Sequence, residues 1–108
     1  MVAVYEGQWF VAEICQEQSH VPKGYLRVSY SVIKGMNDFT WPTNRPDIML
    51  TVVEDILLRG ISVVPLNSRG HFGLQKSDLK RVEALMVVVY FSKYQFFPFF
   101  SVFDFLTL

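Results

Sequence analysis

Hydrophobic and polar residues alternate most regularly in the segment YLRVSYSVI, residues 25–33. The apolar positions are Leu26, Val28, Tyr30 and Val32, and they alternate with Tyr25, Arg27, Ser29 and Ser31. A period of two residues is typical of a β-strand with one buried face. The segment therefore predicts a half-buried strand.

The opening stretch VAVYEGQWFVAEI, residues 2–14, predicts a β-hairpin. Two runs of β-prone residues flank Glu6 and Gly7, and glycine adopts the positive φ that tight hairpin turns require. Alternation along this hairpin assigns Val4, Phe10, Ala12 and Ile14 to the core, and one face of the second run carries Phe10, Ala12 and Ile14. The other face, with Trp9 and Val11, is less polar than a solvated face should be.

Glycines and prolines divide the first two thirds of the chain into segments of strand length. The segment KGMNDF (34–39) predicts a second turn that leads into a strand around FTW (39–41). Further strands are expected in residues 48–58 and 61–66, and Pro65 favours an edge position or a strand end for the latter. Five short antiparallel strands of this kind predict a mainly β fold, a small five-stranded barrel.

The hydrophobic period changes from two to that of a helix after residue 76. Leu79, Val82, Leu85 and Met86 recur at helical spacing, Ser77 is the expected N-cap, and Asp78 suits the first turn. We therefore expect a barrel over residues 1–66, a connecting loop and C-terminal helix over 67–91, and a phenylalanine-rich tail over 92–108.

The C-terminal segment 84–108 differs in composition from the rest of the chain. It holds seven of the ten phenylalanines, which are Phe91, Phe96, Phe97, Phe99, Phe100, Phe103 and Phe105. Its length reaches the roughly 20 apolar residues of a membrane span, but Lys93, Gln95, Pro98 and Asp104 oppose spanning. Three interpretations stay open: a tail that is disordered or packs on the barrel, a membrane anchor, and translated non-coding sequence.

Charge and cysteine content restrict the function classes. Ten basic and ten acidic residues give no net charge, so a chain-wide field for nucleic acid is missing. A nucleic-acid-binding barrel remains an alternative through a local basic segment, in which Lys23, Arg27, Lys34 and Arg45 accompany the possible stacking rings of Tyr25 and Trp41. The single cysteine and the N-terminal residues predict an intracellular protein, nuclear or cytoplasmic, with membrane association as the alternative.

Residues suited to catalysis or metal binding are few. Cys15, His20 and His71 lie at irregular spacing, and no glycine-rich phosphate loop is present. We therefore expect no enzymatic activity, no cofactor and no metal site.

Aromatic residues give the candidate binding site. Tyr5, Trp9, Phe39 and Trp41 lie at or near the two predicted turns, and Asp38 is the acidic neighbour. Rings that face one another attract a methylated ammonium or guanidinium group by cation–π interaction, and a carboxylate adds charge complementarity. The alternative interpretation is that such rings form the core of a small barrel.

The order VAVYEGQWFVAEI, GYLRVSYSVIKG, NDFTW and VVEDIL resembles Tudor and related SH3-like small barrels over residues 2–58. The phrases FTWP…PDI, EDIL and NSRGHFGL are also similar to an uncharacterised module near the C-terminus of many fish proteins, some linked to mobile elements. The first resemblance implies a non-enzymatic module that binds a protein or peptide partner carrying methylated lysine or arginine. It implies cage residues at Tyr5, Trp9, Tyr30 and Phe39, with Asp38 beside them.

Overall fold

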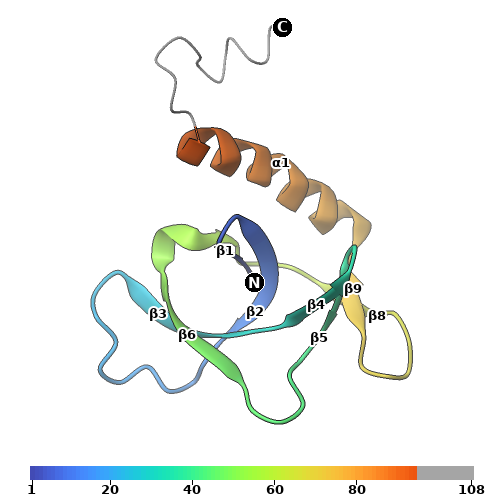
Figure 1. Ribbon diagram of the computed structural model, residues 1–108, viewed down its shortest axis with the longest axis horizontal. Helices are drawn as coiled ribbons and strands as arrows, with labels where there is room; N and C mark the ends of the chain where they lie inside the picture. Colours follow the sequence, from blue (N-terminus) through green and yellow to red (C-terminus); the bar gives the residue numbers. More distant parts are fainter. Residues whose placement is uncertain (95–108) are drawn as a thin grey trace, which may run out of the picture.

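In the computed structural model, residues 1–94 are described, with side chains through Phe91. The larger of its two sheets has five strands and curls into a half-barrel (Figure 1). Its antiparallel strands follow the order β6 (Asp47–Val52), β3 (Tyr25–Tyr30), β2 (Gln8–Ile14), β1 (Val2–Tyr5) and β7 (Ile56–Leu58). A single 3-10 turn, η1 (Val53–Asp55), joins β6 to β7.

The smaller sheet has four strands. Their order is β4 (Val32–Gly35), β5 (Asp38–Thr40), β9 (Phe72–Leu74) and β8 (Val63–Pro65). The two sheets are joined where the alternating segment 25–33 is interrupted at Ser31, so that β3 belongs to the first sheet and β4 to the second.

The prediction of a mainly β fold followed by one helix is confirmed, but the count of five strands is wrong, because residues 1–94 contain nine. One reason is the interruption at Ser31. Another is that β7, β8 and β9 have only three residues each and depend on partners distant in the chain, such as Phe39 for Phe72. Strand β9 lies in segment 67–91, where the sequence predicts a connecting loop and a helix.

The hairpin of β1 and β2 forms as expected. Glu6 and Gly7 have φ values of 50° and 78°, and Tyr5 pairs with Gln8 across the turn. Two successive positive φ values are typical of a type I′ turn, whose twist matches that of the flanking strands.

Both faces of this hairpin are buried, each in a different cluster. One, the sheet cluster, consists of Ala3, Ala12, Val28 and Tyr30. The other, the helix-side cluster, consists of Val2, Val11, Phe39, Phe72, Leu74 and Val82. Two clusters explain why the face with Trp9 and Val11 is apolar in the sequence.

The four residues assigned to the core in the hairpin differ in their burial. Val4 and Ala12 are buried, and Phe10 is half-buried. The prediction that Ile14 belongs to the core is wrong, since 47% of this residue is exposed. Ile14 is the last residue of β2, so alternation alone does not determine whether anything covers it.

Helix α1 (Lys76–Tyr94) runs along one side of the strands (Figure 1). It begins one residue before Ser77, so Ser77 is not its N-cap, and the Leu79 N–H donates to the Gln75 carbonyl at 2.9 Å. Asp78 is in the first turn as expected, and its carboxylate accepts the Ser62 N–H at 2.9 Å. Val82, fully buried, packs α1 onto the helix-side cluster.

The predicted phenylalanine-rich tail, residues 92–108, lies outside the part of the chain whose side chains are described. Within the described residues, no helix is both long and apolar enough to cross a membrane.

Candidate functional site: a pocket around Trp9

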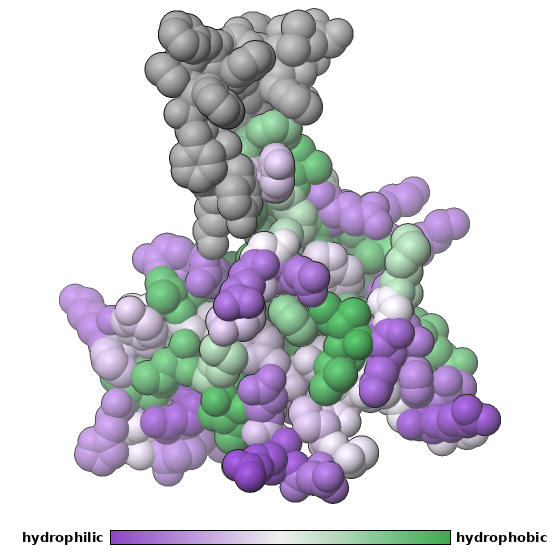
Figure 2. All heavy atoms as spheres, viewed as in Figure 1, coloured by the Kyte–Doolittle hydropathy of each residue, from purple (hydrophilic) through white to green (hydrophobic). Residues whose placement is uncertain are grey.

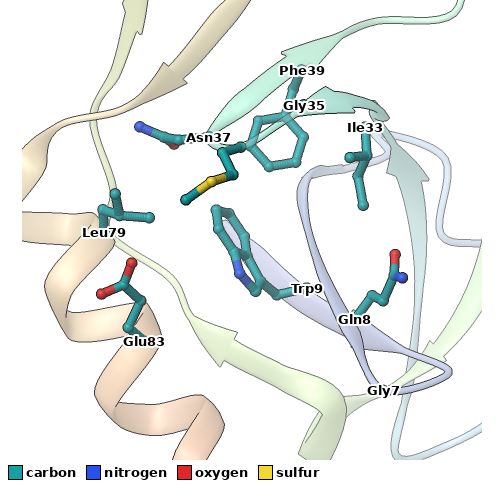
Figure 3. A pocket seen from close by; sticks show the side chains of 10 residues that line it. Gly7, Gln8, Trp9, Ile33, Gly35, Asn37, Phe39, Leu79 and Glu83 are labelled. Atoms are coloured by element: carbon teal, nitrogen blue, oxygen red, sulfur yellow. The ribbon is translucent and has the colours of Figure 1, made fainter.

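A pocket of about 310 Å³ opens between the two hairpin turns and α1 (Figure 3). The β1–β2 turn, β2, the β4–β5 hairpin and α1 all contribute to its wall. The lining residues are Gly7, Gln8, Trp9, Ile33, Gly35, Met36, Asn37, Phe39, Leu79 and Glu83. Segments distant in sequence thus meet at this pocket.

Two aromatic rings form the floor of the pocket. The ring centroids of Trp9 and Phe39 are 5.1 Å apart with an interplanar angle of 50°, a favourable tilted geometry. Phe39 is only 2% exposed, whereas Trp9 is half-buried. Trp9 therefore offers its indole to a ligand, while Phe39 supports it from the core.

The β4–β5 hairpin supplies an apolar wall. Ile33 is 38% exposed and Met36 is 98% exposed, so both side chains are accessible at the rim. An exposed methionine adapts its shape to varied apolar groups.

Asn37 fixes the position of this hairpin. With a φ of 49°, it accepts the Leu74 N–H through Oδ1 at 2.8 Å and donates through Nδ2 to the Leu74 carbonyl at 3.0 Å. Gly73 makes this close approach possible, because a Cβ atom there would lie 2.3 Å from the Asn37 carbonyl oxygen.

Helix α1 supplies the third wall. Leu79 and Glu83 are four residues apart and therefore lie on the same face of the helix. Figure 3 shows Leu79 extending from α1 into the pocket and Glu83 on the pocket side of the helix, with its carboxylate near Leu79. Glu83 is the only charged residue among the described residues that line this pocket, so the lining is mainly apolar, with the polar side chains of Gln8 and Asn37 and one anionic group.

A second and wider hollow, of about 520 Å³, extends along α1. Its lining residues are Trp9, Glu83, Met86, Val87, Tyr90 and Phe91. Trp9 and Glu83 line both hollows, and exposed apolar side chains continue along the helix at Val87 (48%) and Tyr90 (58%). On the face drawn in Figure 2, hydrophobic residues gather in patches between hydrophilic ones.

The predicted site residues do not form one cage. Trp9 and Phe39 both line the pocket. Tyr5, which is 43% exposed, lies against Tyr30 at 6.4 Å, and Trp41 stacks on Phe72 at 5.3 Å. Among the described residues, the pocket thus brings together two of the four predicted rings.

Asp38, the predicted acidic neighbour of the rings, contacts His71. Asp38 Oδ1 lies 2.7 Å from Nδ1 of His71, and this contact ties β5 to the chain just before β9. The carboxylate in the pocket wall is that of Glu83, which the sequence analysis missed. The spacing of Leu79 and Glu83 in the sequence already places them on the same face of a helix. Which part of the molecule this face contacts is known only from the packing of α1 against the strands.

The basic segment considered for nucleic-acid binding is partly occupied by internal contacts. The Arg27 guanidinium donates through Nη1 to the carbonyls of Glu17, at 3.0 Å, and Ser19, at 3.3 Å. Trp41 packs against the helix-side cluster. In residues 1–94 no group of three or more His, Cys, Asp or Glu side chains could hold a metal ion.

The chain matches no protein-family model, no curated protein and no solved structure. The function must therefore be inferred from the geometry of the pocket.

Proposed function

We propose that this protein is a non-enzymatic interaction module that binds a cationic side chain of a partner peptide, a methylated lysine or arginine, in the Trp9 pocket. The observation that supports this proposal is that a half-buried indole and one carboxylate, that of Glu83, line the same mainly apolar pocket within the described residues. The resemblance to Tudor and SH3-like barrels points to the same function, with Glu83 in the role expected for Asp38.

The charge of the pocket favours a cation. A tryptophan face attracts an ammonium or guanidinium group by about 0.5–2 kcal/mol, depending on how far water is excluded. Glu83 adds a favourable charge, and none of the described residues that line either hollow is basic. An anionic ligand would therefore find no positive charge among these described residues to offset the negative charge of Glu83.

The apolar walls favour methylation of that cation. An unmodified ammonium is strongly hydrated, and its transfer beside Ile33, Met36 and Leu79 loses that hydration. Methyl groups replace hydrogen-bonded hydrogens with apolar surface and keep the positive charge. The pocket is therefore expected to bind trimethyl-lysine more tightly than lysine.

Titration with three blocked nine-residue peptides tests this proposal. The peptides share one sequence and differ at the central residue, which is trimethyl-lysine, lysine or the neutral tert-butyl isostere of trimethyl-lysine. Trp41→Phe makes Trp9 the sole tryptophan, because the chain has two, and its fluorescence then reports binding. We expect trimethyl-lysine to bind about 2- to 30-fold more tightly than the neutral isostere.

A pair of glutamate variants locates the charge effect. Glu83→Gln should weaken binding of the trimethyl-lysine peptide a few fold, because an exposed charge contributes about 0.2–1 kcal/mol. Glu54→Gln is the matched control, since Glu54 is also exposed but lines neither hollow. Equal binding of the charged and neutral peptides, or no binding of any peptide, would contradict the proposal.

A further inference from the structure

Strands β2 and β4 diverge beside the Trp9 pocket. The pairing of β2 with β3 ends at Ser31, the residue between β3 and β4, whose N–H donates to the Val11 carbonyl at 3.0 Å. Beyond this point β2 pairs with β1 in the larger sheet, and β4 pairs with β5 at the end of the smaller one. Within the described residues, the side of β4 opposite β5 has no paired strand.

The register shows which backbone groups of β2 face this gap. Met1 and Ala12 exchange two backbone hydrogen bonds, of 3.0 and 2.9 Å, so the polar groups of Ala12 point toward β1. Those of Val11 point the other way, as its bond to Ser31 confirms. Since direction alternates along a strand, the N–H and carbonyl of Trp9 also point away from β1.

The same alternation applies to β4. Ser31 bonds toward β2, so the N–H and carbonyl of Ile33, two residues later, are expected on that side and not on the side of β5. Trp9 and Ile33 both line the pocket, and Figure 3 shows that their side chains come from separate strands. Two strands thus direct polar groups toward the same gap, and no strand within residues 1–94 is paired with them there.

We propose that an extended segment of the partner peptide binds in this gap as an added β-strand along β4, with its cationic side chain in the Trp9 pocket. This inference rests on the proposed function and adds the mode of recognition. Backbone hydrogen bonds to an exposed strand edge supply affinity, and the pocket for alternate side chains supplies specificity. One side chain in two would point toward Trp9.

The form of β4 favours a short peptide over a second copy of this chain. All four residues of β4 are exposed, but its pairing with β5 is irregular between Ile33 and Gly35, where Lys34 lies. Bulges and lysines are common devices that keep sheet edges from pairing with one another over their length. Pairing is therefore expected over the two or three residues beside Ile33.

Backbone N-methylation of the trimethyl-lysine peptide tests the added strand in the full chain. Two isomers are compared with the unmethylated peptide, one methylated at the odd-numbered amides and the other at the even-numbered amides. Strand pairing predicts that at least one isomer binds about tenfold more weakly, because each methyl group removes a donor. Unchanged binding of both isomers would overturn the inference and leave the proposed function intact, whereas no binding of the unmethylated peptide would overturn both.

A variant pair assigns the pairing to β4. Ile33→Pro removes the N–H on the open side, where proline is tolerated in a strand, and Ile33→Thr keeps that N–H. Both substitutions alter the apolar wall of the pocket, so the two variants are compared with each other, and we expect Ile33→Pro to bind about tenfold more weakly than Ile33→Thr. Equal affinity of the two variants would refute pairing along β4, and so would a dimer of the unliganded chain that Ile33→Pro dissociates in sedimentation. If Ile33→Pro does not fold in a thermal scan, the N-methylated isomers alone decide.

Discussion

The two hydrophobic clusters of this protein share the strands β1 and β2 but differ in how completely their margins are shielded from solvent. In the sheet cluster, each of Ala3, Ala12, Val28 and Tyr30 is at most 3% exposed. Phe10 meets Tyr30 edge-on at 5.7 Å, and the Tyr30 hydroxyl lies 2.7 Å from Thr51 Oγ1. The helix-side cluster has an equally buried centre at Phe39 and Val82, but its margin at Trp9 stays open.

This difference follows from how each cluster is assembled. The four buried residues of the sheet cluster lie on three adjacent strands, whose hydrogen-bonded spacing brings their side chains together. The helix-side cluster joins two sheets and a helix, which are not held at a fixed spacing by one ladder of hydrogen bonds. A pocket can therefore remain where these elements do not pack tightly against one another. Trp9 lines such a pocket.

The largest change in the free energy of unfolding should come from a substitution of Phe39, which belongs to both the helix-side cluster and the pocket lining. Phe39→Ala should lower the free energy of unfolding by about 3–5 kcal/mol, because Phe39 is buried against Trp9 and Phe72. Chemical denaturation measures this loss, and Phe39→Leu is the milder control. A loss below about 1 kcal/mol would show that the helix-side cluster is not a true core.

A smaller loss is expected where the β4–β5 hairpin approaches β9. Gly73→Ala places a Cβ atom against the Asn37 carbonyl and should cost about 1–3 kcal/mol or more through overpacking. Gly60→Ala is the matched control, since nothing lies within 4 Å of a Cβ there. Similar unfolding midpoints for the two variants would contradict the close approach.

Tyr30→Phe tests the closure of the sheet cluster. It leaves Thr51 Oγ1 without the Tyr30 hydroxyl and should cost about 1–3 kcal/mol at neutral pH. Burial raises the pKa of Tyr30 above its ordinary value of 10.0, although the hydrogen bond with Thr51 opposes this shift.

The raised pKa of Tyr30 gives this comparison a pH dependence with a definite sign. Folding favours the protonated phenol, so its contribution to stability is complete below pH 10 and is lost as the pH rises through the higher pKa of the folded protein. The difference in unfolding free energy between wild type and Tyr30→Phe should therefore shrink above pH 10. A constant difference up to pH 11.5 would contradict the burial of this phenol.

The smallest effect is expected at Ser31, where the two sheets part. Its hydroxyl is buried and has no hydrogen-bond partner among the described residues. Ser31→Ala should therefore raise the unfolding free energy by about 1 kcal/mol. Destabilisation of the alanine variant would indicate that the hydroxyl has a partner in solution.

Much of the local structure was predictable because it depends on neighbours in the chain. The turn at Glu6 and Gly7, the strand at residues 25–30 and the C-terminal helix all follow from patterns within a few residues. The three-residue strands were not predictable, since a segment such as Phe72–Leu74 becomes a strand only when Phe39 and Val64 are beside it.

The sequence by itself determined that the chain is mainly β, that Trp9 lies on a face too apolar for solvent, and that aromatic rings are the main candidates for binding. Only the tertiary structure decided which rings meet. It separated Tyr5 and Trp41 from Trp9, paired Asp38 with His71, and brought Glu83 to the pocket. The physical reason is that alternation fixes the face of a strand on which a side chain lies, whereas the packing of sheets and helix fixes what that face meets.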